Sequence, residues 1–435
     1  MLLREHLKLI REMKNLSQSE LARRMNYDKS HVSHMESGTR AISLGALEEF
    51  RRALEIQDVP LTIVEKKQFL QELQDWIDLY AAREYEKGSA FVHQKDFAQR
   101  AKWSLDPYLI TQYELACLWH YITLEDDESF KEMMSILREK EYSFDDEQRF
   151  RYYHMIGLNE LYRYQFKHAL VALLKAETMS RQLALTVNCY FEILYYQIAY
   201  CLTEMDYAYL AIEYLAKAEK AASDKANTAF AVYIRTHLAV NYSKIGKTDE
   251  ALLLLESCLR EESNKKNATG TIGWLYSKIG RVHHRKGDYV KANDFYDMAS
   301  QHITDKRDYL QNLFFKAEAL FAQEKIDECV FLIEKGLEES DEDTIANTLL
   351  VALNHSLSLE EPESLEQMET KTIPKLIEYG QHLTAIEYIE KLSSYFGENR
   401  KHKQAAYYNQ LALKICKLLM EGNLTTIFDG TSISN

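Results

Sequence analysis

Five polar side chains within one short stretch could hydrogen-bond to the bases of a nucleic acid. The five are Lys29, Ser30, His31, Ser33 and His34. Their ammonium, hydroxyl and imidazole groups donate or accept hydrogen bonds, and base edges in the major groove of DNA offer both kinds of partner. If the stretch is helical, we expect these side chains to face outward near the start of the helix. The stretch therefore predicts a surface that contacts duplex DNA.

Two short helices with a tight break between them would position these side chains. Ser17 is a good N-cap for a helix over 18–25, with a glutamate at the capping-box offset. Asp28 is expected to cap a second helix over 29–37, and Gly38 to end it in the left-handed conformation. Apolar residues at helical spacing would pack the two helices together, namely Leu21, Ala22, Met25, Val32 and Met35. This arrangement is a helix-turn-helix, which presents the start of its second helix to the major groove.

The same region resembles the phage-repressor-like (Xre/Cro) helix-turn-helix family. The resemblance rests on the letters SQSELARRM and VSHMESG and on an amphipathic segment after Ser43, and it covers roughly residues 3–56. It implies that Gln18 and Ser43 touch DNA phosphates. It also implies that the five polar side chains within 29–34 lie at the bases.

The charge of the whole chain argues against DNA binding until the chain is divided. The formal net charge is −14. Residues 1–60 hold ten Lys and Arg against nine Asp and Glu, whereas the remainder holds 43 against 58. The acidity therefore belongs to the second part, and DNA affinity must come from locally placed cations. The candidates are Arg4, Arg11, Arg23, Arg24, Lys29 and Arg40.

Composition limits the remaining possibilities. Four prolines and 14 glycines in 435 residues favour an all-helical protein. Six cysteines are scattered without any C-x-x-C pair, which argues against a disulfide framework or zinc site and fits a reducing cytoplasm. The sequence contains no run of 18 or more apolar residues, so no membrane span is predicted. The charged N-terminus is unlike a signal peptide. We therefore expect a cytoplasmic protein.

A pattern of about 40 residues recurs through the second part of the chain. Its clearest copy is Tyr289, Ala292, Tyr296 and Ala299, preceded by Gly-Asp. Other copies begin at Phe166, Ala208, Thr248, Ile326 and His402, with a weaker first copy at Phe130 and a degenerate one near Leu365. Another small residue stands nine positions before most of these starts. Small residues at this spacing predict stacked helical hairpins whose helices approach closely.

The repeat resembles the tetratricopeptide repeat, although its units are longer than usual. That resemblance implies a concave groove lined by the first helix of each unit. Among the residues at the family's inner positions, the candidates for peptide binding are Tyr196, Gln197, Tyr200, His237, Lys244, Trp274, Lys278, Arg281, His284, Arg285, Phe314 and Asn354. Such a set suits a short extended peptide, because cations bind carboxylates, amides and imidazoles bind the peptide backbone, and aromatic rings cover apolar side chains.

The expected fold is all-α, with an N-terminal helix-turn-helix bundle followed by a right-handed α-solenoid of tetratricopeptide-like hairpins. We expect a DNA-binding domain over 1–60, ending near Pro60, and linking helices over 61–107 that begin with an amphipathic helix to about residue 85. The repeat domain is expected over 108–421, with a loose tail over 422–435.

This architecture resembles the RRNPP group of peptide-pheromone receptors from Gram-positive bacteria, which includes the NprR, PlcR, Rgg and PrgX types. The resemblance implies a quorum-sensing transcriptional regulator that binds double-stranded operator DNA as a homodimer. A short imported signalling oligopeptide in the repeat groove would switch it. Length and repeat number are most like the NprR type.

Two other functions remain open. The repeats could form a scaffold that sequesters or inhibits a response-regulator protein, or the chain could be a regulator of a phage or mobile element. A metal site at His283 and His284 or at the acidic runs is disfavoured, because we expect those residues in loops or on solvated helix faces. No phosphate-binding loop, nucleophile elbow or H-E-x-x-H motif occurs, so we expect neither an enzyme nor a cofactor.

Overall fold

The structure is a computed structural model, and every regular element in its described residues is helical. It describes residues 3–40, 42–55, 63–95, 97, 106–180, 190–224, 231–264, 269–342 and 344–421. The boundary predicted at Pro60 and the tail predicted over 422–435 lie outside these residues. The chain divides into two compact units, Met1–Met155 and Ile156–Asn435, and each is considered separately. None of the described helices is long and apolar enough to cross a membrane.

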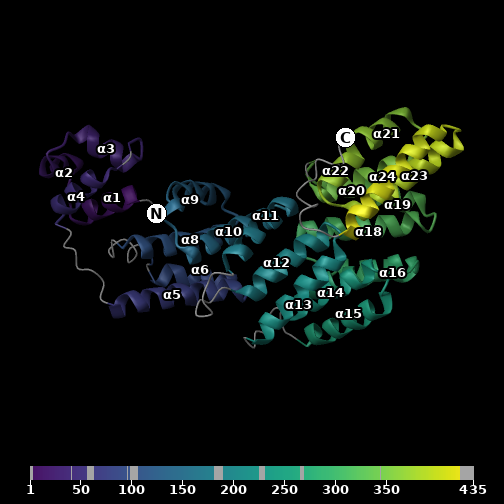
Figure 1. The fold of residues 1–435 in the computed structure, drawn as a ribbon, viewed down its shortest axis with the longest axis horizontal. Helices are drawn as coiled ribbons and strands as arrows, with labels where there is room; N and C mark the ends of the chain where they lie inside the picture. Colours follow the sequence, from purple (N-terminus) through teal and green to yellow (C-terminus); the bar gives the residue numbers. More distant parts are fainter. Residues whose placement is uncertain are drawn as a thin grey trace. The chain divides into compact units, whose positions relative to one another are not determined.

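The first unit begins with a four-helix bundle (Figure 1). Its helices are α1 (Leu3–Met13), α2 (Gln18–Met25), α3 (Lys29–Ser37) and α4 (Leu44–Ala53). Ser17 caps α2 as predicted, because its hydroxyl accepts from the backbone N–H of Glu20 while the Glu20 carboxylate accepts from the backbone N–H of Ser17. Gly38 ends α3 at φ 78°, also as predicted. Asp28 occupies the N-cap of α3, but its side chain makes no capping hydrogen bond, so that part of the prediction was wrong.

The apolar positions predicted between α2 and α3 form the core of this bundle. Leu21, Ala22, Met25, Val32 and Met35 are all buried. They pack with Leu7, Phe50 and Leu54 in one cluster. Burying such side chains stabilises the bundle by about 1.5–3 kcal/mol each. The packed core fixes the outer face of α3, where the polar residues lie.

The helices that follow the bundle differ from the prediction at one point. They are α5 (Ile63–Ala81), α6 (Tyr85–Lys95), α8 (Pro107–Thr123), α9 (Asp127–Glu139), η1 (Glu141–Ser143) and α10 (Asp146–Tyr162). The amphipathic helix expected to reach about residue 85 ends at Ala81. Arg83 adopts φ 61°, a left-handed conformation that stops the helix before α6 begins.

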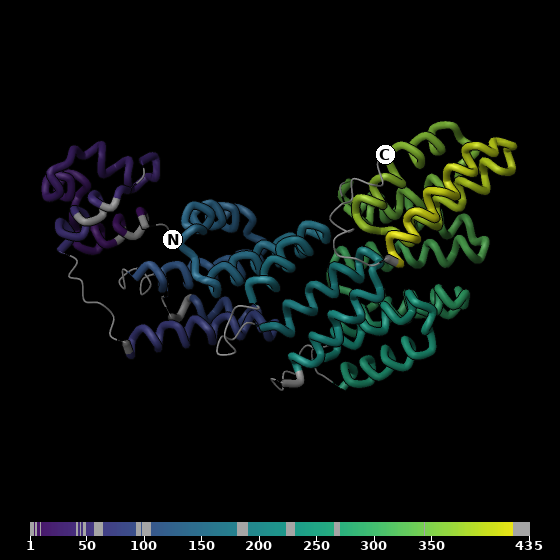
Figure 2. Tube along the Cα trace, in the orientation of Figure 1, coloured from purple at the N-terminus to yellow at the C-terminus, as the bar shows by residue number. Residues whose placement is uncertain are grey.

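The second unit consists of consecutive helical hairpins, whose course is traced in Figure 2. Its helices after α10 are α11 (Phe166–Ser180), α12 (Phe191–Glu204), α13 (Ala208–Asp224), α14 (Ala231–Lys244), α15 (Thr248–Ser263), α16 (Thr269–Arg285), α17 (Tyr289–Ser300), α18 (Lys306–Phe321), α19 (Ile326–Glu339), α20 (Ile345–Leu357), α21 (Pro362–Gln367), η2 (Met368–Thr372), α22 (Ile373–Glu378), α23 (His382–Glu398) and α24 (His402–Glu421). Helices α11, α13, α15, α17, α19 and α24 begin at the predicted repeat starts, which confirms the repeat.

Small residues allow the paired helices to approach, as the pattern predicted. At Gly280 in α16, an added Cβ atom would lie 2.6 Å from the ring of Tyr296 in α17. The degenerate repeat unit near Leu365 departs from the regular hairpin in a different way. Pro374 lies in the first turn of α22, where its missing N–H is tolerated, and the π-helical turn η2 directly precedes that helix. The segment 362–378 is therefore one continuous right-handed helical run with a π-helical turn in its middle.

Candidate functional site

The polar side chains predicted to contact DNA lie on or beside α3. Lys29, Ser30 and His34 are exposed, whereas His31 and Ser33 are half-buried. Ser43 is exposed too, and its hydroxyl caps α4 by accepting from the backbone N–H of Ala46 at 3.2 Å. These six residues therefore share one small bundle in which packing fixes the helices that carry them.

The segment after α3 holds two of the imidazoles in place. The Arg40 guanidinium contacts the His31 ring, and the His34 Nδ1 lies 2.7 Å from the Thr39 hydroxyl. The backbone N–H of Arg40 donates to the carbonyl of His34 at 3.1 Å. Arg40 is itself exposed. This segment thus brings a further cation beside the residues predicted to lie at the bases.

A buried ion pair corrects the prediction for Arg11. Its guanidinium donates to both carboxylate oxygens of Glu36, at 2.7 and 3.0 Å, and to the carbonyl of Leu16. The two side chains are 8% and 2% exposed. Hydrogen bonding to Glu36 raises the pKa of Arg11. Gln18 also donates to Glu36, at 2.8 Å. Arg11 therefore links α1 to α3 and is not available to DNA.

In the second unit, five of the predicted groove residues form a continuous ladder of contacts. The ring centroid of His237 lies 5.4 Å from Tyr196, 5.0 Å from Tyr200 and 5.5 Å from Trp274. The ammonium of Lys278 lies 5.8 Å from the Trp274 ring, within the range of a cation–π contact. The ladder crosses α12, α14 and α16, so it connects three successive repeats.

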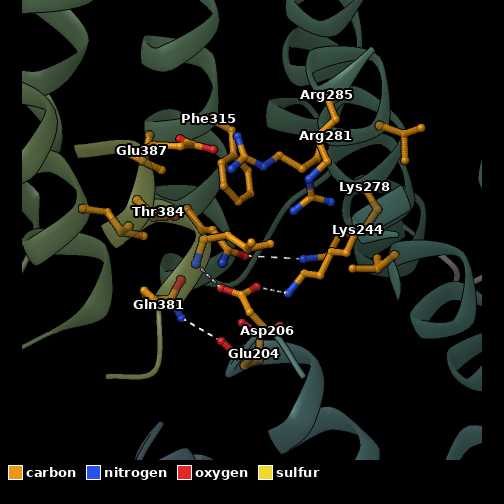
Figure 3. A pocket seen from close by; sticks show the side chains of 16 residues that line it. Glu204, Asp206, Lys244, Lys278, Arg281, Arg285, Phe315, Gln381, Thr384 and Glu387 are labelled. Atoms are coloured by element: carbon orange, nitrogen blue, oxygen red, sulfur yellow. Dashed lines mark hydrogen bonds and ion pairs between the residues drawn. The ribbon is translucent and has the colours of Figure 1, made fainter. Parts of the chain in front are cut away.

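A cavity of about 80 Å³ lies beside this ladder. By volume it has room for several water molecules or a small polar group. Its lining includes five predicted residues, Lys244, Lys278, Arg281, Arg285 and Phe314. Figure 3 shows the four cations along one wall, opposite residues from the start of α23.

Two of the four cations are paired with carboxylates. Lys244 lies 2.5 Å from Asp206, and their side chains are 9% and 8% exposed. Arg281 lies 2.6 Å from Glu318, and its guanidinium covers the Phe315 ring at 4.4 Å. Burial alone would lower the pKa of Arg281, but Glu318, together with Tyr296 and Glu387, raises it overall. These two pairs are internally compensated.

The other two cations have only weak partners. The Lys278 ammonium lies 3.5 Å from the Gln311 side-chain oxygen, and an Arg285 nitrogen lies 3.5 Å from the Ser243 hydroxyl. Within the described part of the chain, no ion pair joins either cation to a carboxylate. Burial lowers the pKa of Lys278, and burial together with Arg281 lowers that of Arg285 to about 10. Lys278 and Arg285 are thus the two cavity cations without an ion pair in the described residues, although Glu204 and Glu387 also line the cavity.

Contacts between distant repeats close one end of the cavity. Asp206, in the turn between α12 and α13, accepts from the backbone N–H of Leu383 at 2.9 Å. Gln381 donates to the carbonyl of Glu204 at 3.0 Å, as Figure 3 shows. At Gly380, φ is 76° and an added Cβ would lie 2.8 Å from Met205. We call this contact between the α12–α13 turn and the start of α23 the closure.

Three predicted groove residues lie apart from both the ladder and the cavity lining. Gln197 is buried, and Asn354 is exposed on α20. His284 meets Tyr289 edge-on, with ring centroids 5.2 Å apart. Burial, followed by Arg281 and Arg285, lowers the pKa of His284 to about 3.

The expectation that His283 and His284 are in a loop or on a solvated face was wrong. Both lie in the last turn of α16 and are half-buried. The His283 ring stacks on Phe295 at 5.3 Å. The two imidazoles are thus covered by aromatic rings of α17.

Sequence reasoning missed several residues that line the cavity. They are Glu204, Asp206, Gln381, Thr384 and Glu387. Two of these residues could have been found from the repeat pattern, whose inner positions include those four and fifteen residues before a repeat start. Glu204 stands four residues before Ala208, and Glu387 stands fifteen residues before His402. Asp206 and Gln381 could not be found in this way, because they reach the cavity only through the closure.

Comparison with known proteins supports both parts of this architecture. Residues 7–58 match the family described as Helix-turn-helix. A curated relative, the exocyst complex component EXO84A of Arabidopsis thaliana, is 21% identical over 188 residues. That match covers 41% of this chain and 24% of the exocyst protein, so the chain spans about a quarter of its length. The match over residues 7–58 agrees with the helix-turn-helix bundle, and the array of helical hairpins follows that bundle in the chain.

The hairpin array has the fold of the Rap and NprR proteins. A Rap protein complexed with competence and sporulation factor is 16% identical, with a TM-score of 0.70 over 82% of this chain and 100% of that one. NprR in complex with its cognate peptide NprX is 23% identical, with a TM-score of 0.70 over 80% and 99%. The apo form of NprR from B. thuringiensis is 22% identical, with a TM-score of 0.62 over 81% and 99%. The predicted fold class and the resemblance to RRNPP architecture are confirmed.

Proposed function

We propose that this chain is a cytoplasmic transcriptional regulator that binds operator DNA and is switched by a short imported peptide. The DNA-binding domain would be residues 1–60, the linking helices 61–107 and the peptide-sensing domain 108–421. The observation that carries the proposal is the combination of a helix-turn-helix with a partly charged, partly aromatic cavity. That cavity lies in a fold shared with NprR bound to its cognate peptide.

A homodimer suits the weak charge of one helix-turn-helix module. Two modules acting together double the number of phosphate and base contacts, and they require an operator with two half-sites. Peptide binding would change the curvature of the hairpin array and so reposition the two modules. A peptide can shift this equilibrium only by its differential affinity for the two arrangements.

DNA recognition can be tested by selecting duplexes from a randomised pool with the full-length protein. We expect enrichment of an inverted repeat. The double variant Lys29→Ala, Ser33→Ala should lose this selection while retaining peptide binding, because both side chains lie on α3. Lys131→Ala is a matched control, since Lys131 is exposed on α9. An unchanged operator in the double variant would contradict the assignment of α3 to base contacts.

Peptide switching can be tested by repeating the selection with synthetic peptides from a small reading frame next to the gene. One of these peptides should change the affinity for the selected duplex. The double variant Lys278→Ala, Arg281→Ala should respond to no peptide but keep basal DNA binding, since both residues line the cavity. A normal response in that variant would rule out the cavity as the peptide site.

The same experiments separate the two other readings. A scaffold that sequesters a response regulator would enrich no duplex, and it would bind a purified response regulator in a peptide-dependent manner. A regulator of a phage or mobile element would select DNA as proposed, and its operator would lie in the element that carries the gene.

A further inference from the structure

Among the residues that the structure describes, two of the four cavity cations are paired with carboxylates and two are not, and this difference indicates the charge of the ligand. Lys278, Arg281 and Arg285 follow one another along one face of α16, at spacings of three and four residues. Arg281, in the middle, is held by Glu318 at 2.6 Å. Its two neighbours reach only neutral oxygens at 3.5 Å. Of the three cations on this face of α16, the middle one is paired with a carboxylate and the two on either side have no such pair in the described part of the chain.

Leaving a cation poorly paired in a concave, partly dehydrated site is unfavourable unless another group compensates it. The two remaining carboxylates that line the cavity, Glu204 and Glu387, form no ion pair with either cation within the described residues. Burial, followed by the charge of Glu318, raises the pKa of Glu387.

We propose that the cavity binds an acidic group of the ligand between Lys278 and Arg285. This inference rests on the proposed function in one respect, namely that the acidic group belongs to a short peptide. The group is a carboxylate, either at the peptide C-terminus or on an Asp or Glu side chain. Lys244 and Arg281 do not hold it, because Asp206 and Glu318 already occupy them.

The surroundings of the two cations fit this assignment. Gln311 and Ser243 place neutral hydrogen-bonding groups beside Lys278 and Arg285. The Trp274 ring, 5.8 Å from the Lys278 ammonium, extends the site into the aromatic ladder. A peptide with its acidic group in the cavity could therefore lay apolar side chains along that ladder.

The test uses three pools of N-acetylated random hexapeptides without lysine or arginine. One pool has a free C-terminal carboxylate and no Asp or Glu, the second is amidated with one fixed Asp, and the third is amidated without any acid. Dissociation constants are measured by calorimetry on peptides recovered from full-length protein. We expect peptides from one acidic pool to bind about tenfold or more tightly than amidated neutral analogues of the same sequence. Inorganic phosphate at millimolar concentration forms a fourth arm.

Variants locate the effect. Lys278→Met and Arg285→Met should each remove the preference for the acidic peptide. The matched control Lys286→Met should keep it, because Lys286 is exposed and pairs with Asp249 on the surface. Arg285→Lys retains the charge and should restore part of the preference, which separates loss of charge from loss of folding.

The outcomes distinguish this inference from the proposed function. Equal binding of acidic and neutral peptides would overturn the anion site and leave the peptide receptor standing. Binding by no pool would overturn the peptide function. If no pool binds, the phosphate arm decides whether an anion site exists. A rise in melting temperature with phosphate that is absent in Lys278→Met would support a site for a free anion. If phosphate has no effect, the anion site is also contradicted.

Discussion

The helix-turn-helix bundle and the cavity of the second unit both contain arginine, yet they compensate its charge differently. In the bundle, Arg11 meets both oxygens of Glu36, which also accepts from Gln18. In the cavity, the hydrogen-bond partner of Arg285 among the described residues is the Ser243 hydroxyl at 3.5 Å. The first arrangement is complete within the chain. The second has spare hydrogen-bonding capacity and spare charge.

This difference separates a structural role from a binding role. A buried pair with its hydrogen bonds satisfied links helices and gains nothing from a ligand. A cation without a carboxylate weakens the free protein, and a ligand that supplies an anion recovers that free energy. The comparison therefore predicts opposite responses to removing a charge in the two regions.

The largest effect is expected at Arg11. Arg11→Met leaves the Glu36 carboxylate buried without a cation, and breaking such a pair costs about 3–5 kcal/mol. Hydrogen exchange of the amides in α2 and α3 of the full-length protein should accelerate accordingly. Arg23→Met is the control, because Arg23 is exposed on the same bundle.

A second variant sharpens this result. In Arg11→Met, Glu36→Met both charges are absent, so most of the lost protection should return. If the double variant exchanges as fast as the single one, the ion pair is not the reason for the loss, and the first half of the comparison fails.

The closure is the next most sensitive point. Gly380→Ala places a Cβ at φ 76° and 2.8 Å from Met205, which should cost about 1–3 kcal/mol. The urea midpoint should fall, and the Leu383 amide, which donates to Asp206, should exchange faster. Gly397→Ala in α23 is the control, because nothing lies within 4 Å of its added Cβ, and it should gain about 0.5–1 kcal/mol. Unchanged protection at Leu383 in Gly380→Ala would show that the cavity does not depend on the closure.

Titration of His284 tests whether burial and two neighbouring arginines keep this imidazole neutral. Burial, Arg281 and Arg285 lower its pKa to about 3 in the folded protein, compared with 6.5 in an unfolded chain. The unfolded state therefore binds the proton first. The contribution of His284 to the free energy of unfolding is therefore highest above pH 6.5. It decreases as the pH falls below that value, by about 2 kcal/mol at pH 5.

The variant His284→Phe removes this titration and keeps an aromatic ring against Tyr289. Urea unfolding of both proteins between pH 7.5 and pH 5 should give a flatter pH dependence for the variant. Parallel curves would mean that the imidazole protonates freely in the folded state, which the positive surroundings should prevent.

Much of this architecture could be predicted because it depends on local patterns. The capping box at Ser17, the left-handed Gly38 and the repeat starts each follow from a few neighbouring residues. The same logic failed at Arg11. Its position on an amphipathic helix gives no sign that Glu36, on another helix, faces it across a buried interface.

The candidate site was predictable only in part. The inner positions of the repeat locate the cations of α16 and the ladder around His237, since each unit repeats the same geometry. Which cations are paired depends on contacts between repeats. Asp206 holds Lys244 and also the start of α23, 177 residues away in sequence. No local pattern encodes that closure.

The smallest expected effect has the opposite sign and tests the comparison most directly. Lys278→Met removes a cation that has no carboxylate partner and leaves an apolar side chain beside Trp274. We expect the free protein to become more stable by about 1 kcal/mol, because no ion pair within the described residues is broken and the buried ammonium is removed. The measurement is the urea midpoint of the ligand-free protein.

Lys244→Met is the matched control on the same wall of the cavity. It strands Asp206, which is 8% exposed, and should destabilise the protein. Two lysines lining one cavity would then respond in opposite directions to the same substitution, as expected if the carboxylate partner of Lys244 decides the effect. If Lys278→Met also destabilises the ligand-free protein, Lys278 serves the fold as Lys244 does. Its charge would then be no indication of an acidic ligand.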